Sequence, residues 1–151
     1  VKLSTENLLS LYQLREELEG LACRLAASQM SDAEIREMQD LLDQHLSSQR
    51  VREGESYYQE AGDLDFHYRV ILGSKNDYLI NILCDELYYL VRMYRVQLGM
   101  NGPRVSRAFD EHKAILNAIA NRDGELADLL MRRHIAASRR NIEKQLEQTG
   151  T

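Results

Sequence analysis

Three of the four histidines in this chain occur where imidazole rings from different segments could meet around one ion. Asp63 and His67 are four residues apart in a stretch with helical periodicity, so both side chains project from one face of a helix. His112 and His134 lie in two further amphipathic segments, on or beside the apolar face of each. One carboxylate and three imidazoles brought together in a helical bundle would bind a divalent transition metal, with zinc as the first choice and nickel, manganese, cobalt or iron as alternatives.

Each of these residues also has an ordinary structural explanation. A single helical histidine is more often a hydrogen-bonded, partly buried side chain than a metal ligand, and Asp63 could be a solvated charge. The fourth histidine, His45, has polar neighbours and is expected at the surface. Taken together, the four residues make a metal site more plausible than any one of them does, but spacing alone leaves both interpretations open.

The composition indicates one globular, helical domain. At 151 residues the chain can bury a core, and 44% hydrophobic with 28% charged residues is a globular balance. A single proline and many Leu, Glu and Arg residues favour helices over strands. The net charge of −5 argues against direct binding of nucleic acid, because a domain that grips a polyanion is usually basic. Two cysteines without a C-x-x-C motif, no membrane span and no signal peptide lead us to expect a cytoplasmic protein with reduced thiols.

Six amphipathic segments follow one another with short connections. Their candidate N-caps are Ser4 or Thr5, Ser31, Asn76 or Asp77, and Asp123, and the segments are predicted to begin near residues 5, 32, 57, 77, 103 and 124. Short connections place consecutive helices side by side and antiparallel. The pattern predicts an all-α antiparallel bundle of six helices.

Beyond these features, the chain resembles the FCD domain, the C-terminal effector-binding domain of the FadR-type branch of GntR bacterial transcription regulators. The resemblance covers nearly the whole chain and rests on the order of several motifs rather than on any single one. The motifs are Leu11-Tyr12-Gln13-Leu14-Arg15 through Leu18-Glu19 to Leu25-Ala26-Ala27, Asp63-x-x-x-His67, Glu111-His112-x-x-Ile115-x-x-Ala118-Ile119, Asp123 to Ala127, and His134-Ile135.

The resemblance implies a six- or seven-helix bundle whose centre holds a divalent metal through one aspartate and three histidines. By position these ligands are Asp63, His67, His112 and His134. A small carboxylic acid, such as a hydroxy acid, a sugar acid or a citrate-like acid, is implied to bind beside or on the metal, because members that bind acyl-CoA lack this histidine set. The expected function is therefore effector sensing for transcription regulation, without enzymatic activity.

The resemblance also implies partners outside this bundle. Residues 1–7 are expected to end an interdomain linker, and residues 8–148 to form the ligand-binding bundle. The family joins such a bundle to an N-terminal winged helix-turn-helix domain, absent from this chain, that binds operator DNA as a homodimer. Operator DNA would then be a partner only through that domain, and no membrane is expected.

A carboxylate effector needs a cation, and Arg15 is the first candidate. A guanidinium binds a carboxylate bidentately, and Arg15 matches the first-helix arginine that in the family often reaches the cavity. The alternative is an ordinary surface pair with Glu19 at i, i+4. Ser138 and Asn141 follow His134 by four and seven residues on one helix face and are further candidates.

Weaker candidates lie around the fourth segment. Arg92 and Arg95 flank its apolar stripe, and their usual explanation is a solvated side chain. A group of tyrosines is expected to pack in the core or an interface with hydroxyls at the edge, and one hydroxyl could donate to the effector. These are Tyr57, Tyr58, Tyr68, Tyr88, Tyr89 and Tyr94.

Two other functions compete with a sensor. A metal site of three histidines and a carboxylate could activate water in a hydrolase, but no H-E-x-x-H motif and no second general base accompanies it. A bundle that only dimerises, with a vestigial site, is the third possibility. Metal content and turnover of esters and phosphates distinguish the three.

Overall fold

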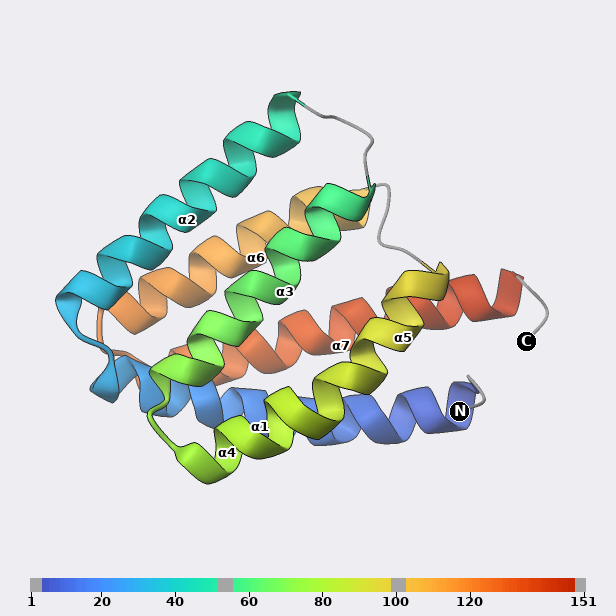
Figure 1. Cartoon of the computed structure of the whole chain (residues 1–151), viewed down its shortest axis with the longest axis horizontal. Helices are drawn as coiled ribbons and strands as arrows, with labels where there is room; N and C mark the ends of the chain where they lie inside the picture. Colours follow the sequence, from blue (N-terminus) through green and yellow to red (C-terminus); the bar gives the residue numbers. More distant parts are fainter. Residues whose placement is uncertain (1–3, 52–55, 99–102, 149–151) are drawn as a thin grey trace.

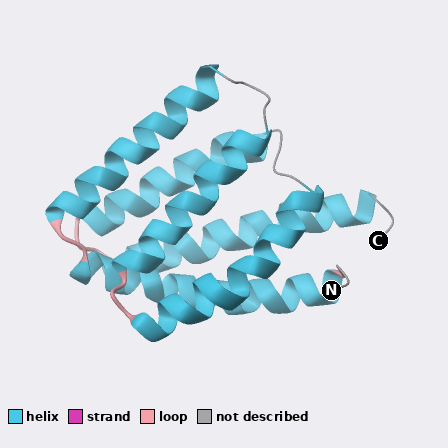
Figure 2. Ribbon diagram, in the orientation of Figure 1, coloured by secondary structure: helices cyan, strands magenta, loops and turns pink. Residues whose placement is uncertain are grey.

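The computed structural model describes residues 4–51, 56–98 and 103–148, with only the backbone described at 5, 46–51, 56–64, 94–98, 103 and 105–106. Apart from its turns, the described chain is helical throughout (Figures 1 and 2). The fourth and fifth helices are joined without a break by a π-helical turn, η1, and the three together form one continuous rod. With this rod counted once, the described chain forms six helical rods, which confirms the predicted all-α bundle. None of the described helices combines the length and the apolar character that a membrane span requires. The elements are α1 (Thr5–Gln29), α2 (Asp32–Val51), α3 (Ser56–Gly73), α4 (Asp77–Asn81), η1 (Ile82–Leu87), α5 (Tyr88–Leu98), α6 (Pro103–Ala120) and α7 (Gly124–Gln148).

Capping side chains set where the helices begin. Ser31 and Glu34 form the predicted capping box of α2, in which each side chain accepts from the other residue's backbone N–H at 3.1 Å. Ser4, Asn76 and Asp123 cap α1, α4 and α7 by accepting from the N–H three residues later, at 3.1 Å in each case. These caps confirm the predicted helix starts. The first helix accordingly begins within the stretch that was expected to be linker.

The two longest helices, α1 and α7, run antiparallel along each other and form the base of the bundle (Figure 1). Both α3 and α6 pack against this base, and α2 covers α3 and α6. The α4–η1–α5 rod passes beside α1, with which η1 is in contact. Their apolar faces meet in one core, where burying a large side chain contributes about 1.5–3 kcal/mol. Fully buried members of this core include Leu8, Tyr12, Phe66, Ile115, Ile119, Met131 and Ile135.

Gly20 allows α1 and α7 to approach closely. A Cβ atom at this position would lie 2.2 Å from Oδ1 of Asp128 and 2.9 Å from Nε of Arg132. The Asp128 carboxylate has little freedom to move aside, because Arg24 binds it at 2.9 Å and Arg132 binds it at 2.6 Å. The close packing of α1 against α7 therefore requires glycine at position 20.

The π-helical turn η1 brings a polar group into the interior. Such turns are rare in proteins and are frequent at functional sites. Leu83 and Leu87 of η1 pack in the core. The next residue, Tyr88, is 8% exposed and donates its hydroxyl to Glu19 of α1 at 2.7 Å. The rod thereby contributes a hydrogen-bond donor to the space between α1 and α3.

Replacing Gly20 with alanine should destabilise the domain by about 1–3 kcal/mol, although alanine is the better helix former. The cause would be the added methyl group against the Asp128 carboxylate, and urea denaturation measures the effect. In an Asp128→Ala background that collision is absent, so Gly20→Ala should there be neutral or stabilising. Equal destabilisation in both backgrounds would contradict this explanation.

Candidate metal centre

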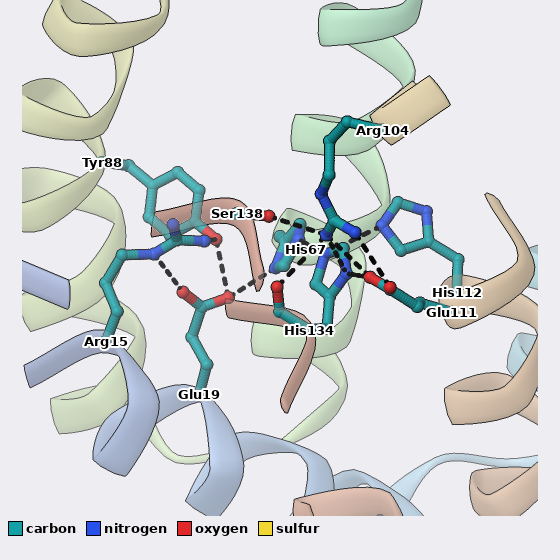
Figure 3. Close-up of polar contacts among 9 residues, drawn as sticks. All are labelled: Arg15, Glu19, His67, Tyr88, Arg104, Glu111, His112, His134 and Ser138. Atoms are coloured by element: carbon teal, nitrogen blue, oxygen red, sulfur yellow. Dashed lines mark hydrogen bonds and ion pairs between the residues drawn. The ribbon is translucent and has the colours of Figure 1, made fainter. Parts of the chain in front are cut away.

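Three histidine rings point at one another in the middle of the bundle (Figure 3). His67 of α3, His112 of α6 and His134 of α7 are 0%, 2% and 1% exposed. Nε2 of His134 lies 3.0 Å from Nε2 of His67 and 3.3 Å from Nε2 of His112. The fold therefore brings together the three histidines that the sequence singled out.

Aromatic packing holds these rings in place. Phe66 stacks on His112 with ring centroids 4.1 Å apart and planes 12° from parallel. The rings of His67 and His134 are also stacked, with centroids 4.9 Å apart. Packing of this kind restricts the rotation of the rings, as a preorganised binding site requires. Asp63, the fourth predicted ligand, lies on α3 four residues before His67, and its side chain is outside the described residues.

Two glutamates that the sequence analysis did not propose hold the outer nitrogens of two rings. Oε1 of Glu19 lies 2.6 Å from Nδ1 of His67, and Oε1 of Glu111 lies 2.6 Å from Nδ1 of His134. Burial raises the pKa of the Glu19 carboxyl, but a neighbouring guanidinium and His67 outweigh it and lower the pKa to about 2. At Glu111 burial also raises the pKa, but His134 and the guanidinium of Arg104 outweigh it and lower the pKa to about 2. Both carboxylates are therefore ionised near neutral pH and act only as acceptors.

This arrangement determines which nitrogen of each ring carries the proton. Because a carboxylate cannot donate, Nδ1 of His67 and Nδ1 of His134 must donate to it. In the neutral rings Nε2 then keeps its lone pair, and the two lone pairs face each other across 3.0 Å. A cation bound between the two Nε2 atoms would remove this repulsion. A proton can bridge only two ring nitrogens, whereas a metal ion can be coordinated by the Nε2 atoms of all three histidines. Histidines that bind metals characteristically donate their other N–H to a carboxylate in this way.

Arg15 is enclosed on the inner face of α1 and is 0% exposed. Its Nε donates to Glu19 at 2.6 Å, and Nη2 donates to the Tyr88 hydroxyl at 3.3 Å. Burial disfavours the charged guanidinium, but Glu19 and the nearby tyrosines keep the pKa of Arg15 well above its ordinary value. Among the described residues, Nη1 of Arg15 and the hydroxyl of Tyr12 have no hydrogen-bond partner. The Arg15 guanidinium thus supplies a permanent positive charge and an unused N–H donor, and the Glu19 carboxylate lies between it and His67.

Arg104 is a second buried arginine, 4% exposed, that the sequence analysis did not identify. Its two terminal nitrogens donate to Glu111 at 2.9 and 2.7 Å. Nη2 also donates to the carbonyl oxygen of His134 at 3.2 Å and to the hydroxyl of Ser138 at 3.0 Å. Ser138, a predicted effector contact, therefore belongs to the polar network around His134.

Comparison with known proteins identifies the fold family of this histidine-centred bundle. Residues 10–137 match the family model of the FCD domain. The chain belongs to the FCD domain family. The match spans most of the chain and confirms the resemblance that its ordered motifs indicated.

Relatives of this FCD domain are longer proteins. The chain is 28% identical over 134 residues to the HTH-type transcriptional regulator LutR of Bacillus subtilis (strain 168), covering 86% of this chain and 59% of LutR. The fold is shared with Streptococcus agalactiae GntR, with a TM-score of 0.73 and 20% identity over 93% of this chain and 62% of that one. The FCD domain described here thus spans less than two thirds of the length of either protein.

Of the remaining effector candidates, the two whose side chains are described lie outside the polar network of this FCD domain. Asn141 is half-buried two turns beyond His134 on α7 and takes no part in the contacts drawn in Figure 3. Arg92 is exposed on α5, in agreement with a solvated side chain. The side chain of Arg95 is outside the described residues.

The surface pair that the sequence left open as the alternative for Arg15 and Glu19 is not what the structure shows, because both side chains are 0% exposed although they pair as i, i+4. One expectation about a single residue was wrong. His45 was expected at the surface, but its side chain is only 14% exposed and its ring centroid lies 6.4 Å from that of Phe109. The reason is helical phase: His45 follows Leu42 on the face that α2 turns toward α6, whatever the polarity of its immediate neighbours.

The missed residues left a weak signal in the sequence. Glu19 follows Arg15 by one turn and Tyr12 by two, so a charged pair interrupts the apolar face of the first helix. Glu111 directly precedes His112, and Arg104 lies two turns before Glu111. Charges at apolar-face positions indicate burial in pairs, but they do not indicate which distant ring they contact.

Replacing Glu19 with glutamine should destabilise the metal-free protein strongly, because Arg15 would remain buried without its counter-charge. Removing one partner of a buried ion pair costs about 3–5 kcal/mol. Urea denaturation in the presence of a chelator measures this without any contribution from metal. The control is Glu37→Gln, at an exposed position of α2, which should change little. A loss at Glu19 no greater than at Glu37 would contradict the importance of the pair.

Proposed function

We propose that this FCD domain is the effector-sensing part of a GntR-type, FadR-branch transcription regulator that acts as a homodimer. In this proposal His67, His112 and His134, with Asp63, bind one divalent transition metal, zinc being the first choice. A small carboxylic acid then binds next to it with the help of Arg15. Operator DNA is bound by an attached winged helix-turn-helix domain. The observation that carries the proposal is the convergence of three buried Nε2 atoms. In two of these rings the other nitrogen, Nδ1, is bonded to a carboxylate.

The spacing of the ring nitrogens supports a metal ligand set. Two nitrogens that each bind a zinc ion at about 2.1 Å lie about 3.0–3.4 Å apart at octahedral or tetrahedral angles. The two separations that involve Nε2 of His134, to Nε2 of His67 and of His112, are 3.0 and 3.3 Å, and the ligand nitrogens of the three rings all lie within 4.8 Å of one another. The ion would supply a Lewis-acidic positive charge at the centre of the bundle. The histidines would hold it, while Glu19 and Glu111 orient two of the rings.

The environment of Arg15 supports the binding of an acid. A buried guanidinium with an unused N–H is a strong carboxylate donor, because the bond is charge-assisted and shielded from water. A second unused polar group is close to it: the Arg15 guanidinium lies over the Tyr12 ring, 4.8 Å from its centroid, and the Tyr12 hydroxyl has no hydrogen-bond partner among the described residues. Ser138, bonded to Arg104, and Asn141 are secondary contact candidates.

The geometry favours binding over turnover. Both carboxylates that contact the histidines are already held by arginines, so neither is free to act as a general base. A sensor instead needs two arrangements of the homodimer that bind the acid with different affinity. In this proposal the acid favours the arrangement that releases operator DNA.

Replacing His112 or His134 with alanine should abolish most metal binding. Protein purified without a metal-affinity tag and reloaded with Zn²⁺ should hold about one ion per chain, and each variant far less. The melting temperature of the variants should no longer rise with Zn²⁺, because only a ligand of the native state stabilises it. His45→Ala, at the histidine outside the cluster, should retain the full metal content. If all the variants bound as much metal as the wild-type protein, the three clustered histidines would not be the metal ligands.

Replacing Arg15 with lysine should weaken acid binding at least about tenfold while the metal stays bound, because lysine keeps the charge but loses the bidentate fork. A thermal-shift panel of acetate, L-lactate, malonate, gluconate and citrate on Zn²⁺-loaded protein identifies the acid, and calorimetry measures its affinity. Arg92→Lys, at an exposed arginine, is the matched control. Unchanged affinity in Arg15→Lys, or loss of the metal, would contradict the role of Arg15.

A further inference from the structure

Part of α7, residues 132–144, is strongly basic in a chain whose net charge is −5. This stretch contains four arginines and one lysine but only one acidic residue. The arginines form two adjacent pairs, Arg132-Arg133 and Arg139-Arg140, which repeat after seven residues. Seven residues are close to two helical turns, or about 10 Å along the helix axis. Each member of the first pair therefore shares a face of α7 with the corresponding member of the second pair.

The two pairs divide their charges in the same way. Arg132 forms ion pairs at 2.6 and 2.7 Å with carboxylates of α7 and α1, and Nε of Arg139 lies 3.5 Å from a carboxylate of α7. Arg133 and Arg140 are exposed, and within the described residues neither takes part in a hydrogen bond or an ion pair. Two guanidiniums two turns apart on one face are thus left without a counter-charge from the described chain.

Both of these arginines, Arg133 and Arg140, line a groove between α6 and α7. The groove has a volume of about 490 Å³, which is the size of a small-molecule pocket. Of the residues that line α7 between the arginines, His134 is turned toward the other histidines, and Ala136 and Ala137 carry only methyl groups. Two long side chains can therefore converge on one ligand group that lies over the alanines.

The opposite wall of the groove, on α6, is only partly charged. Glu111 is already balanced by Arg104 at 2.7 Å. Asp110 is exposed, and no described residue forms a hydrogen bond or an ion pair with it. Ala114 and Leu130, the lining residues nearest to the turn between α6 and α7, make that end apolar. The groove thus combines two unbalanced positive charges, one negative charge and an apolar end.

A phosphate monoester fits this combination of groups. Its phosphate carries a charge of about −1.5 to −2 near neutral pH and three strong acceptor oxygens. Three oxygens are enough for two guanidiniums, whereas the two oxygens of a carboxylate match the fork of one. The carboxylate of Asp110 only accepts hydrogen bonds, so it favours a hydroxyl group on the carbon skeleton of the ester. The apolar end of the groove would contact that skeleton.

Duplex DNA also offers phosphates, but this surface suits it poorly. Asp110 lies on the wall opposite the arginines, and a DNA backbone would bring a row of phosphates toward this carboxylate. The chain is also acidic as a whole, whereas a domain that binds DNA directly is usually basic. A groove with two arginines on one wall and a carboxylate on the other therefore favours a small molecule.

We propose that Arg133 and Arg140 form a binding site for a small, hydroxylated phosphate monoester in the groove between α6 and α7. The site goes beyond the proposed sensing of a carboxylic acid and does not rest on it, because neither arginine belongs to the polar network around the histidines. Glu111 and His134 nevertheless form part of the groove wall. A ligand in the groove would therefore lie against the solvent side of the candidate metal centre.

The first test is isothermal titration calorimetry with glycerol 3-phosphate and glucose 6-phosphate in a buffer free of phosphate. At least one ester should bind the wild-type chain, and Arg133→Gln and Arg140→Gln should each weaken its binding at least about tenfold, because each removes a charge-assisted contact. Arg139→Gln, at the neighbouring arginine that already has a carboxylate, is the matched control and should bind as the wild type does. No binding of either ester, or an equal loss in Arg139→Gln, would overturn the proposal.

Two comparison ligands test what the groove recognises. Inorganic phosphate should bind at least about tenfold more weakly than the ester, because it has no carbon skeleton for the apolar end and no hydroxyl group on such a skeleton for Asp110. A DNA duplex of random sequence should show no binding that depends on Arg133. Equal affinity for inorganic phosphate would overturn the assignment to an ester. Duplex binding that is lost in Arg133→Gln would assign the arginines to nucleic acid instead.

A groove-filling variant tests the position of the site without changing its charge. Ala137→Leu places a larger side chain between the two arginines and should weaken ester binding at least about tenfold. Its stability in urea should change little, because Ala137 is only half-buried and leucine is a good helix former. Unchanged ester binding in Ala137→Leu would place the ligand outside the groove and overturn the proposal.

The same titration separates this site from the proposed metal and acid site. Ester binding should persist in Arg15→Lys and in protein stripped of metal with phenanthroline, an uncharged chelator that does not compete for the arginines. A chain that binds the ester but neither Zn²⁺ nor a carboxylic acid would retain this site and lose only the proposed function. Loss of ester binding in Arg15→Lys would place the ester at Arg15 and overturn the groove site.

Discussion

The rest of the structure depends on one buried carboxylate. Glu19 is 0% exposed and accepts hydrogen bonds from Arg15, from Tyr88 and from His67. A buried ion of this kind is tolerated only when its charge and its lone pairs are satisfied. The three donors come from α1, α5 and α3, so satisfying one carboxylate fixes the relative positions of three helices. The orientation of His67, and hence of the cluster, follows from that requirement.

The cluster is built with a repeated unit on its two sides. On one side the chain of contacts runs from Arg15 through Glu19 to His67, and on the other from Arg104 through Glu111 to His134. In each unit the arginine balances the carboxylate, so the carboxylate can orient an imidazole without bringing an uncompensated negative charge into the core. The two units differ in their exposure, because Glu19 is enclosed, whereas the Glu111 side chain is 31% exposed. The second unit is therefore the one that solvent can reach.

Local chemistry in the sequence predicts the helices and part of the site. Caps such as Ser31 and Asn76 act over three residues, so their helix starts were predicted and are confirmed. The three histidines were also recognised, because their type is rare and their positions follow an apolar face. Glu19, Glu111 and Arg104 were missed, since a pair of opposite charges one or two helical turns apart has the same pattern on a surface and in a core. Only the distant partners, 48 residues away for Glu19 and His67, decide between the two.

The first helix links the proposed ligand site to the rest of the bundle. Its inner face carries Arg15 and Glu19, whose contacts reach Tyr88 of α5 and His67 of α3. The same helix packs along its length against α7, which carries His134. In the proposed sensor, an acid that binds Arg15 therefore acts on a helix that touches both sides of the cluster. Differential affinity for two positions of this helix would be sufficient to couple the acid to the arrangement of the homodimer.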